Sequence, residues 1–504
     1  MILLIPLTSL RGAEGELPKE IQNIMHQPKY DHSMWGMYVK DLQTGKVLFD
    51  VNSDKLFSPA STTKIFSIAA LLHTFGDDYR FKTPVFASSN VKDGKLQGNL
   101  ILVAQGDLTL GGRQPDADTI SFTKLDHSIA NFVPGTILTS EDPLKGLTEL
   151  AKQVYEFGIR EIIGDVFIDD SLFNTTENRE MVLAPMMINE NLIDIIINPT
   201  TLDQKANITW RPVVQGYSVE NRVTTVAKNG PFAIEITADK SGQNIVVKGT
   251  VPLNQRDLIQ TYTIQEPNAF ARAAFIQALQ KQGVVVNLTS DKSTLSQPLS
   301  SFRDLKQVGL WTSPPLSEYA KLILKVSHNL GADLVPLLLA SHQGKKTFEE
   351  GMLLLGNFAT QNVKLISDSF VLLDAAGGND NRLTPMGEVK LLEFMHGQSP
   401  DKFKKFFDAL PILGIDGSLE DYAKKTQAAG KVRAKPGTGV TLNAATGNYF
   451  LITQALAGYI DGKNGHQFAY MLVVNNAKMP TINDVNAIFE DAGQISSAIY
   501  DLTE

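Results

Sequence analysis

The first hundred residues alternate between strand-like and helix-like hydrophobic patterns. Two apolar runs within 35–51 flank a turn-type sequence at 43–46, which predicts a β-hairpin. A helix is then predicted from about 61 to 75, opened by Pro59 and ended by a glycine. Its body, 65–72, is apolar on nearly all sides, so we expect this helix to be buried in a core.

The hydrophobic pattern changes twice further along the chain. Short strand-like runs dominate from about 81 to 298, with one helix-like stretch at 144–157 and a polar, aperiodic loop at 111–143. Helical periodicity returns after 301. Three strands are then expected to close the chain, at 430–434, 449–460 and 467–475. The simplest organisation is one mixed α/β (α+β) domain formed by residues 19–80 and 299–504, with a β-rich region of one or two subdomains inserted at 81–298.

Composition narrows the classes of partner and chemistry. The chain has 504 residues, enough for two or three domains, and a formal net charge of -8, which argues against a nucleic-acid partner. Cysteine is absent, so a disulfide framework and a thiol nucleophile are excluded. The apolar run from Ile2 to Leu10 is too short to span a bilayer. We interpret residues 1–18 as the remnant of a signal peptide, the alternative being a packed or disordered N-terminus, and expect no transmembrane anchor.

The first motif that carries chemistry is S-x-x-K, at Ser61-Thr62-Thr63-Lys64. A spacing of three places Ser61 and Lys64 on one face of the predicted helix. A serine hydroxyl becomes a strong nucleophile only when a base removes its proton. A lysine buried by an apolar helix can be that base, because burial favours its neutral form. The alternative is a capping serine followed by a solvated lysine.

Two further motifs follow in the same order along the chain. Ser327-His328-Asn329 is an S-x-N between two helical stretches, where a hydroxyl and an amide can point into one cleft. The alternative is a helix terminus. Lys435-Pro436-Gly437-Thr438 follows a short strand; a lysine on an edge strand can hold a carboxylate, and glycine admits a substrate backbone. The alternative is a solvent-exposed strand end.

Together, S-x-x-K, S-x-N and K-x-G form the motif set of penicillin-binding proteins and β-lactamases. The chain resembles the D-alanyl-D-alanine carboxypeptidases of the penicillin-binding protein 4 type, the low-molecular-mass class C group. The segments 57–64, 98–110, 163–169, 313–318 and 410–419 carry the resemblance beyond the motifs. More than 260 residues separate Lys64 from Ser327, which favours this family over single-domain β-lactamases. The resemblance implies a transpeptidase-like domain of the serine β-lactamase type with an inserted region.

The resemblance also implies a mechanism. Ser61 would attack the D-Ala-D-Ala carbonyl of a peptidoglycan stem peptide and release D-alanine. Lys64 would be the general base, and Ser327 would pass a proton to the leaving amine. Water would hydrolyse the acyl-enzyme, and β-lactam antibiotics would acylate the same serine. The family's machinery also cuts crosslinks to diaminopimelate, so both carboxypeptidase and endopeptidase activity in the periplasm are expected.

Four residues are expected to bind the substrate in a protein of this type. Asn329 would bind the substrate amide, and Lys435 with Thr438 would bind the terminal carboxylate. The backbone N–H groups of Ser61 and Thr438 would form the oxyanion hole. Asp169 matches a family position that can meet the diaminopimelate amine, although it can equally be the end of a strand.

Two departures from the family pattern leave other functions open. Pro436 replaces the threonine of K-T-G, which removes a hydroxyl donor, and residues 374–378 differ from the family's D-G-S-G-L turn. An esterase or amidase with the same serine site, and a peptidoglycan-binding protein with impaired turnover, are the alternatives. The eight histidines form no H-E-x-x-H pair, so we expect neither a metal nor a cofactor.

Overall fold

The computed structural model describes residues 17–289 and 305–503. The predicted signal-peptide remnant, apart from its last two residues, and the 298/299 boundary of the inserted region lie outside these residues. The chain divides into two compact units. The first consists of Met1–His73, Ile323–Ser327 and Met352–Glu504, and the second of Thr74–Leu322 and His328–Gly351.

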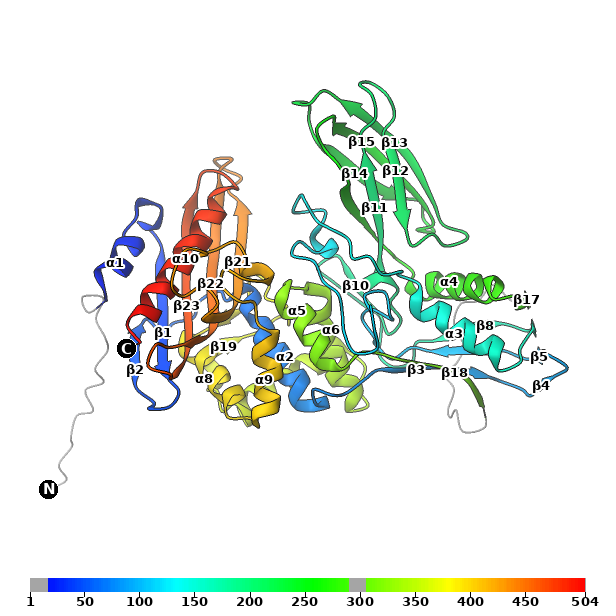
Figure 1. Ribbon diagram of the computed structural model, residues 1–504, viewed down its shortest axis with the longest axis horizontal. Helices are drawn as coiled ribbons and strands as arrows, with labels where there is room; N and C mark the ends of the chain where they lie inside the picture. The colour runs from blue at the N-terminus through cyan, green and yellow to red at the C-terminus, as the bar shows by residue number, and fades with distance from the viewer. Residues whose placement is uncertain (1–16, 290–304, 504) are drawn as a thin grey trace. The chain divides into compact units, whose positions relative to one another are not determined.

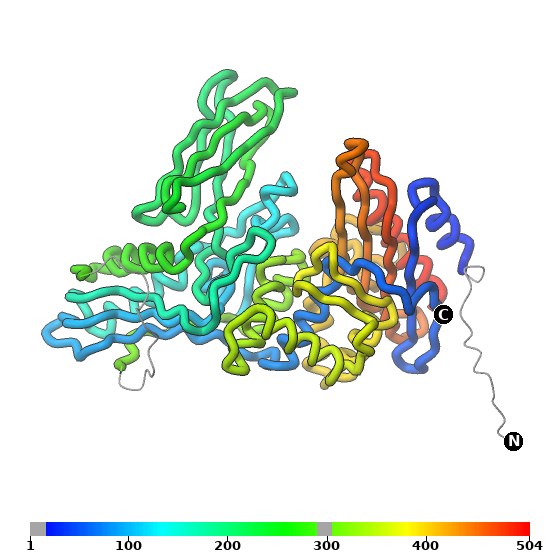
Figure 2. The backbone as a smooth tube through the Cα atoms, turned by 180° about the vertical axis from the view of Figure 1, so that it is seen from behind, coloured from blue at the N-terminus to red at the C-terminus, as the bar shows by residue number. Residues whose placement is uncertain are grey.

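The first unit is built on a five-stranded antiparallel sheet with the order β2-β1-β23-β22-β21. The strands are β1 (Met34–Asp41), β2 (Val47–Val51), β21 (Val432–Leu442), β22 (Tyr449–Asp461) and β23 (Gln467–Met479). The predicted N-terminal hairpin is confirmed, and it adds to the three C-terminal strands (Figure 2). β21 continues well beyond the predicted 430–434 and therefore contains the third motif.

Helices cover both faces of this sheet (Figure 1). α10 (Asp484–Asp501) and α1 (Lys19–Met25) share a core with one face, while α8 (Pro385–His396) packs on β1, β22 and β23. Tyr459 Oη on β22 donates to the carbonyl of Leu392 on α8 at 2.8 Å, which ties the second face to its helix. The expectation that strands close the chain is wrong. α10 closes it, because Ile488, Ala492, Ile495 and Ile499 recur at helical spacing and are buried.

The S-x-x-K segment forms a buried helix, as predicted. A 3₁₀ turn (Ala60–Thr62) leads into α2 (Thr63–Phe75), whose residues 63–72 are all buried. An all-round apolar helix can be stable only inside a core. Other elements of this unit are a π-helix (Phe358–Asn362), β19 (Phe370–Val371), β20 (Arg382–Leu383) and α9 (Pro400–Ala409), and α7 (Phe348–Asn357) begins in the second unit and ends in the first.

The second unit is rich in β-structure. Its sheets have the orders β18-β3-β6-β8, β17-β7-β5-β4, β12-β11-β16, β13-β15-β14 and β10-β9. The strands are β3 (Lys82–Ala87), β4 (Val91–Lys92), β5 (Lys95–Gln97), β6 (Leu100–Val103), β7 (Glu161–Ile163), β8 (Val166–Asp169), β9 (Thr176–Asn178), β10 (Met181–Leu183), β11 (Leu192–Asn198), β12 (Asn207–Arg211), β13 (Ser218–Val226), β14 (Ala233–Ala238), β15 (Asn244–Pro252), β16 (Leu258–Thr263), β17 (Val285–Asn287) and β18 (Lys306–Thr312).

The helices of the second unit agree only in part with those predicted from the sequence. The predicted helix at 144–157 is α3 (Lys145–Glu156), and the predicted loop at 111–143 contains only a short 3₁₀ turn. The expectation of a single helix within 81–298 is wrong, because α4 (Pro267–Lys281) is a second one with buried Phe270 and Phe275. α5 (Leu316–Lys325) extends from this unit into the first, and α6 (Asn329–His342) lies in the second.

Candidate active site

Ser61 and Lys64 form a close pair in the first unit. Ser61 is part-exposed in the 3₁₀ turn, and Lys64, one turn later, is completely buried. Lys64 Nζ lies 2.9 Å from Ser61 Oγ and 2.5 Å from the carbonyl oxygen of Ala376. The predicted S-x-x-K geometry is therefore present: an accessible hydroxyl within proton-transfer distance of a buried amine.

A folded loop at 374–378 presents the carbonyl that contacts Lys64. The Asp374 carboxylate accepts hydrogen bonds from the backbone N–H groups of Ala376, Gly377 and Gly378, at 2.7–3.0 Å. Gly377 has φ +99°, and a Cβ there would lie 1.9 Å from the carbonyl oxygen of Ala60, so only glycine fits. The role of this loop was missed. Asp374 two residues before Ala376 is an Asx-turn signal, but it does not reveal what the turn faces.

The second and third motifs meet at Lys435. Its Nζ donates to Ser327 Oγ at 2.9 Å and to the carbonyl of Pro436 at 2.7 Å. Ser327 has φ +62°, an uncommon backbone conformation for a serine. Lys325, two residues earlier, binds Asp416 at 2.6 and 2.7 Å and thereby anchors the end of α5. This ion pair fixes the chain two residues before Ser327.

The third motif packs directly on the nucleophile segment. A Cβ at Gly437 would lie 2.2 Å from the carbonyl oxygen of Pro59 and 3.0 Å from the backbone nitrogen of Ser61. Only a glycine permits this approach. Lys435 is completely buried, so the alternative of a solvent-exposed strand end is wrong.

Pro436 is accommodated because β21 is an edge strand. The N–H of Ala434 donates away from β22, to the carbonyl of Pro411 at 2.9 Å. N–H groups alternate in direction along a strand, so the missing N–H of Pro436 would also have pointed away from β22. The sheet ladder therefore loses no hydrogen bond. By the same alternation, the N–H of Thr438 points to the open edge.

Lys435 carries the electrostatic signature of the site. Burial, followed by the charge of Lys64, lowers the pKa of Lys435 well below its ordinary range. Its two acceptors, the Ser327 hydroxyl and the Pro436 carbonyl, are both uncharged. Burial and a neighbouring lysine thus both disfavour the charged form of Lys435.

Asn329 and Asp169 belong to the second unit. Asn329 is the first residue of α6. Asp169 is the last residue of β8 and is buried; its Oδ1 accepts the N–H of Ser171 at 3.0 Å, and its Oδ2 has no partner among the described residues. The substrate-binding roles of both residues stay predictions.

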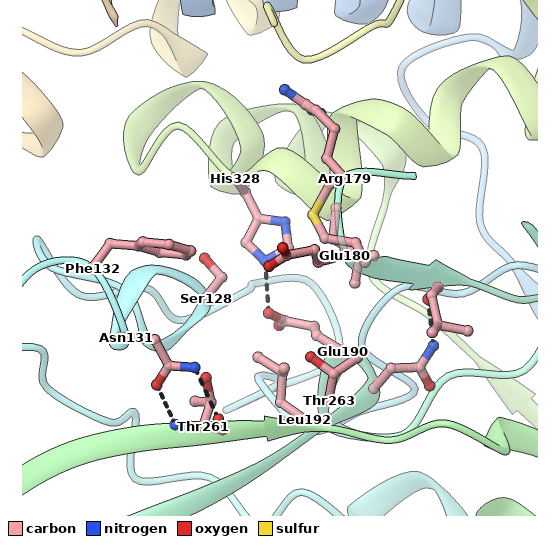
Figure 3. Close-up of a pocket in the computed structure, with 14 residues that line it drawn as sticks. Ser128, Asn131, Phe132, Arg179, Glu180, Glu190, Leu192, Thr261, Thr263 and His328 are labelled. Carbon is pink, nitrogen blue, oxygen red and sulfur yellow. Dashed lines mark hydrogen bonds and ion pairs between the residues drawn. The ribbon is translucent and has the colours of Figure 1, made fainter. Parts of the chain in front are cut away.

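His328, the middle residue of S-x-N, joins a buried charge cluster in the second unit (Figure 3). Its Nδ1 accepts the N–H of Gly331 and caps α6, so the ring proton must be on Nε2, which donates to Glu190 Oε2 at 2.7 Å. Arg113 also binds Glu190, with Nη2 at 2.9 Å from Oε2. His328 and Glu190 line a cavity of about 120 Å³ together with Asn131. No sequence pattern indicated this cluster.

The cluster contains a set of possible metal donors that is already occupied. Ligand atoms of Asp126, Glu190 and His328 lie within 4.8 Å of one another. However, the Arg113 guanidinium binds both carboxylates, at 2.7–3.0 Å to Asp126, and His127 Nε2 is 2.9 Å from Glu190. A fixed cation therefore satisfies these carboxylates, and the cluster is a charge network.

Comparison with solved structures shows the fold. Penicillin-binding protein 4 (dacB) from Haemophilus influenzae has the same fold, with a TM-score of 0.72 and 19% identity over 95% of this chain and 99% of that chain. Its complex with a β-lactam gives the same values. The fold is thus the mixed α/β fold of the penicillin-binding proteins, as predicted.

The family follows from the sequence match. The model of the D-Ala-D-Ala carboxypeptidase 3 (S13) family matches residues 17–492, and the chain belongs to this family. The D-alanyl-D-alanine carboxypeptidase of Actinomadura sp. (strain R39) is 25% identical over 517 residues, covering 95% of this chain and 86% of the relative. The predicted family is confirmed, and the chain is a hydrolase of the serine D-Ala-D-Ala carboxypeptidase class. Across residues 17–289 and 305–503, no helix combines the length and apolar character needed to cross a bilayer.

Proposed function

We propose that the protein is a periplasmic DD-carboxypeptidase and DD-endopeptidase that cleaves peptidoglycan stem peptides through an acyl-enzyme on Ser61. The observation that carries the proposal is the 2.9 Å separation of Ser61 Oγ from Lys64 Nζ, with the amine buried and the hydroxyl part-exposed. Lys64 takes the serine proton as Oγ attacks the D-Ala-D-Ala carbonyl.

The residues around this pair suit the remaining steps. Ser327 bridges to Lys435 and passes the proton to the leaving amine. The oxyanion that develops on the carbonyl is stabilised by the N–H groups of Ser61 and Thr438, the second of which points to the open edge of β21. Lys435 binds the substrate carboxylate, whose negative charge favours the protonated form of the lysine, because the other acceptors of Lys435 are uncharged. Asn329 and Asp169 are proposed to bind the substrate amide and the diaminopimelate amine.

A fluorescent penicillin tests the nucleophile. The wild-type chain should be labelled covalently, and Ser61→Ala should abolish labelling while leaving the circular dichroism spectrum unchanged. Ser33→Ala is the matched control, because Ser33 contacts the carbonyl of Asn476 on the exposed surface and should label at the wild-type rate. Labelling of Ser61→Ala at the wild-type rate, or at another serine by peptide mapping, would refute the assignment.

Substrate class is tested with a stem pentapeptide. Release of D-alanine by the wild type, and its loss in Ser61→Ala, supports a peptidase. Penicillin labelling without release of D-alanine would instead favour an esterase or a peptidoglycan-binding protein with impaired turnover. Cleavage of a crosslinked dimeric peptide measures the endopeptidase activity separately.

A further inference from the structure

Beside the third motif, Thr438 forms a cross-strand pair with Gln454. The two residues lie directly opposite each other on β21 and β22. Thr438 is part-exposed, whereas Gln454 is 2% exposed. The Thr438 hydroxyl donates to Gln454 Oε1 at 2.8 Å. This pair decides what the only hydroxyl of K-P-G-T can offer a substrate.

The carbonyl of Ala455 fixes the direction of this hydrogen bond. Gln454 Nε2 donates to that carbonyl at 3.2 Å. A carbonyl is only an acceptor, so the amide must turn its NH₂ toward Ala455 and its oxygen toward Thr438. The amide oxygen is also only an acceptor. The single hydrogen of the Thr438 hydroxyl is therefore committed to Gln454, and only lone pairs remain for a ligand.

This commitment bears on how the site binds a carboxylate. An ionised carboxylate accepts hydrogen bonds and cannot donate them. Pro436 has neither a hydroxyl nor an N–H, so it cannot donate a hydrogen bond to the carboxylate in place of Thr438. Side-chain donation to a carboxylate from 435–438 is thus left to Lys435, unless the Thr438–Gln454 bond breaks.

We infer that Gln454 is a specificity-determining residue: it withholds the Thr438 hydrogen and thereby weakens the preference for acyl donors that end in a free carboxylate. The inference rests on the proposed function. Donors that end in an uncharged amide lose less at this site, because they do not depend on a charge-assisted hydrogen bond.

The test compares two stem peptides, one ending in D-Ala-D-Ala carboxylate and the other in the corresponding C-terminal amide. The measured quantity is the ratio of their kcat/KM values for acylation. Gln454→Met keeps the side-chain length and removes the strong acceptor, so the Thr438 hydrogen is released. The carboxylate-to-amide ratio should rise by about tenfold, the scale of one hydrogen bond to a charged group.

Two further variants make the result specific. Thr438→Val in the Gln454→Met background should remove the gain, because the released hydroxyl is then absent. Gln454→Glu keeps an acceptor oxygen toward the Thr438 hydroxyl, because any proton that it carries would be donated to the Ala455 carbonyl, so its ratio should stay at or below that of the wild type. A rise in the ratio for Gln454→Glu would overturn the inference independently of whether the methionine variant folds.

Failure of the inference and failure of the proposed function give different results. If the wild type and Gln454→Met both acylate but share one ratio, or the ratio falls, Gln454 does not set specificity. If the wild type forms no acyl-enzyme with either peptide, the proposed function fails, and the inference fails with it.

Discussion

Two buried basic side chains, one in each unit, have opposite electrostatic environments. Arg113 is 4% exposed in the second unit and is bound by two carboxylates, with Nη1 2.7 Å from Asp126. Lys435 is 0% exposed in the first unit and has a hydroxyl and a carbonyl as acceptors. Burial alone would lower both pKa values. For Arg113 the Asp126 and Glu190 carboxylates outweigh it and raise the pKa, whereas that of Lys435 is lowered well below its ordinary range.

The difference separates a structural cluster from a reactive site. A buried charge that is fully paired contributes a fixed geometry and is costly to break. A buried lysine whose acceptors are uncharged can bind an anion or take part in proton transfer. Changes in the cluster around Arg113 should therefore reduce stability, and changes around Lys435 should alter rates.

The largest effect is expected for Glu190→Ala. This change leaves Arg113, His127 and His328 buried without a shared anion, which typically costs about 3–5 kcal/mol of unfolding free energy. Urea unfolding of the full chain, combined with hydrogen exchange of β11, measures it. Glu220→Ala, which breaks an exposed ion pair with Arg222 in the same unit, is the matched control and should have a much smaller effect. Equal effects of the two changes would show that the cluster is not structural.

Lys64→Ala should act on rate instead. Loss of the general base should slow acylation by a fluorescent penicillin at least about a hundredfold at neutral pH. The overall fold should be retained. Burying the lysine amine costs free energy unless it is hydrogen-bonded, and alanine carries no such cost. Lys55→Ala changes an exposed lysine that contacts Asp54 and serves as the control. An unchanged acylation rate in Lys64→Ala would mean that another group is the base.

The reactive site could be predicted largely because its signals are local in sequence. Ser61 and Lys64 are one helical turn apart, so their proximity follows from helix geometry alone. The buried helix follows from its all-round apolar pattern. Ser327 and Lys435 could be brought together only through the resemblance to a family, because 108 residues separate them.

Groups with distant partners could not be predicted. Ala376 contacts Lys64 through a backbone carbonyl 312 residues away, and a carbonyl leaves no trace in residue identity. Arg113 and Glu190 are 77 residues apart in segments without regular spacing. The ion pair between them depends on how the strands and loops of the second unit pack, which no single-sequence pattern encodes.

The pH dependence of stability tests the paired cluster without removing its central carboxylate, one pH unit at a time. Burial alone would lower the pKa of His127, but the Asp194 and Glu190 carboxylates outweigh it and raise the pKa to about 10. This contribution is complete below about pH 6.5 and is lost as pH rises through about 10, because the unfolded chain releases the proton first. The free energy of unfolding should fall by about 1.4 kcal/mol per pH unit between these values. His127→Gln should flatten this slope, and parallel slopes in urea titrations would contradict the assignment.

Pro436→Thr should produce the smallest change in rate or stability, and the substitution lies next to Lys435. Threonine supplies a hydroxyl whose hydrogen Gln454 does not hold, because position 436 lies opposite Leu456. The restored N–H points to the open edge of β21, so the sheet ladder is undisturbed. One hydrogen bond to a charged group contributes roughly 1.5–3 kcal/mol, so acylation by a D-Ala-D-Ala peptide should become about tenfold faster or more. The gain should be absent for the C-terminal amide, which serves as the control substrate. Slower acylation would mean that Pro436 is an adaptation to another substrate, and would favour the esterase alternative.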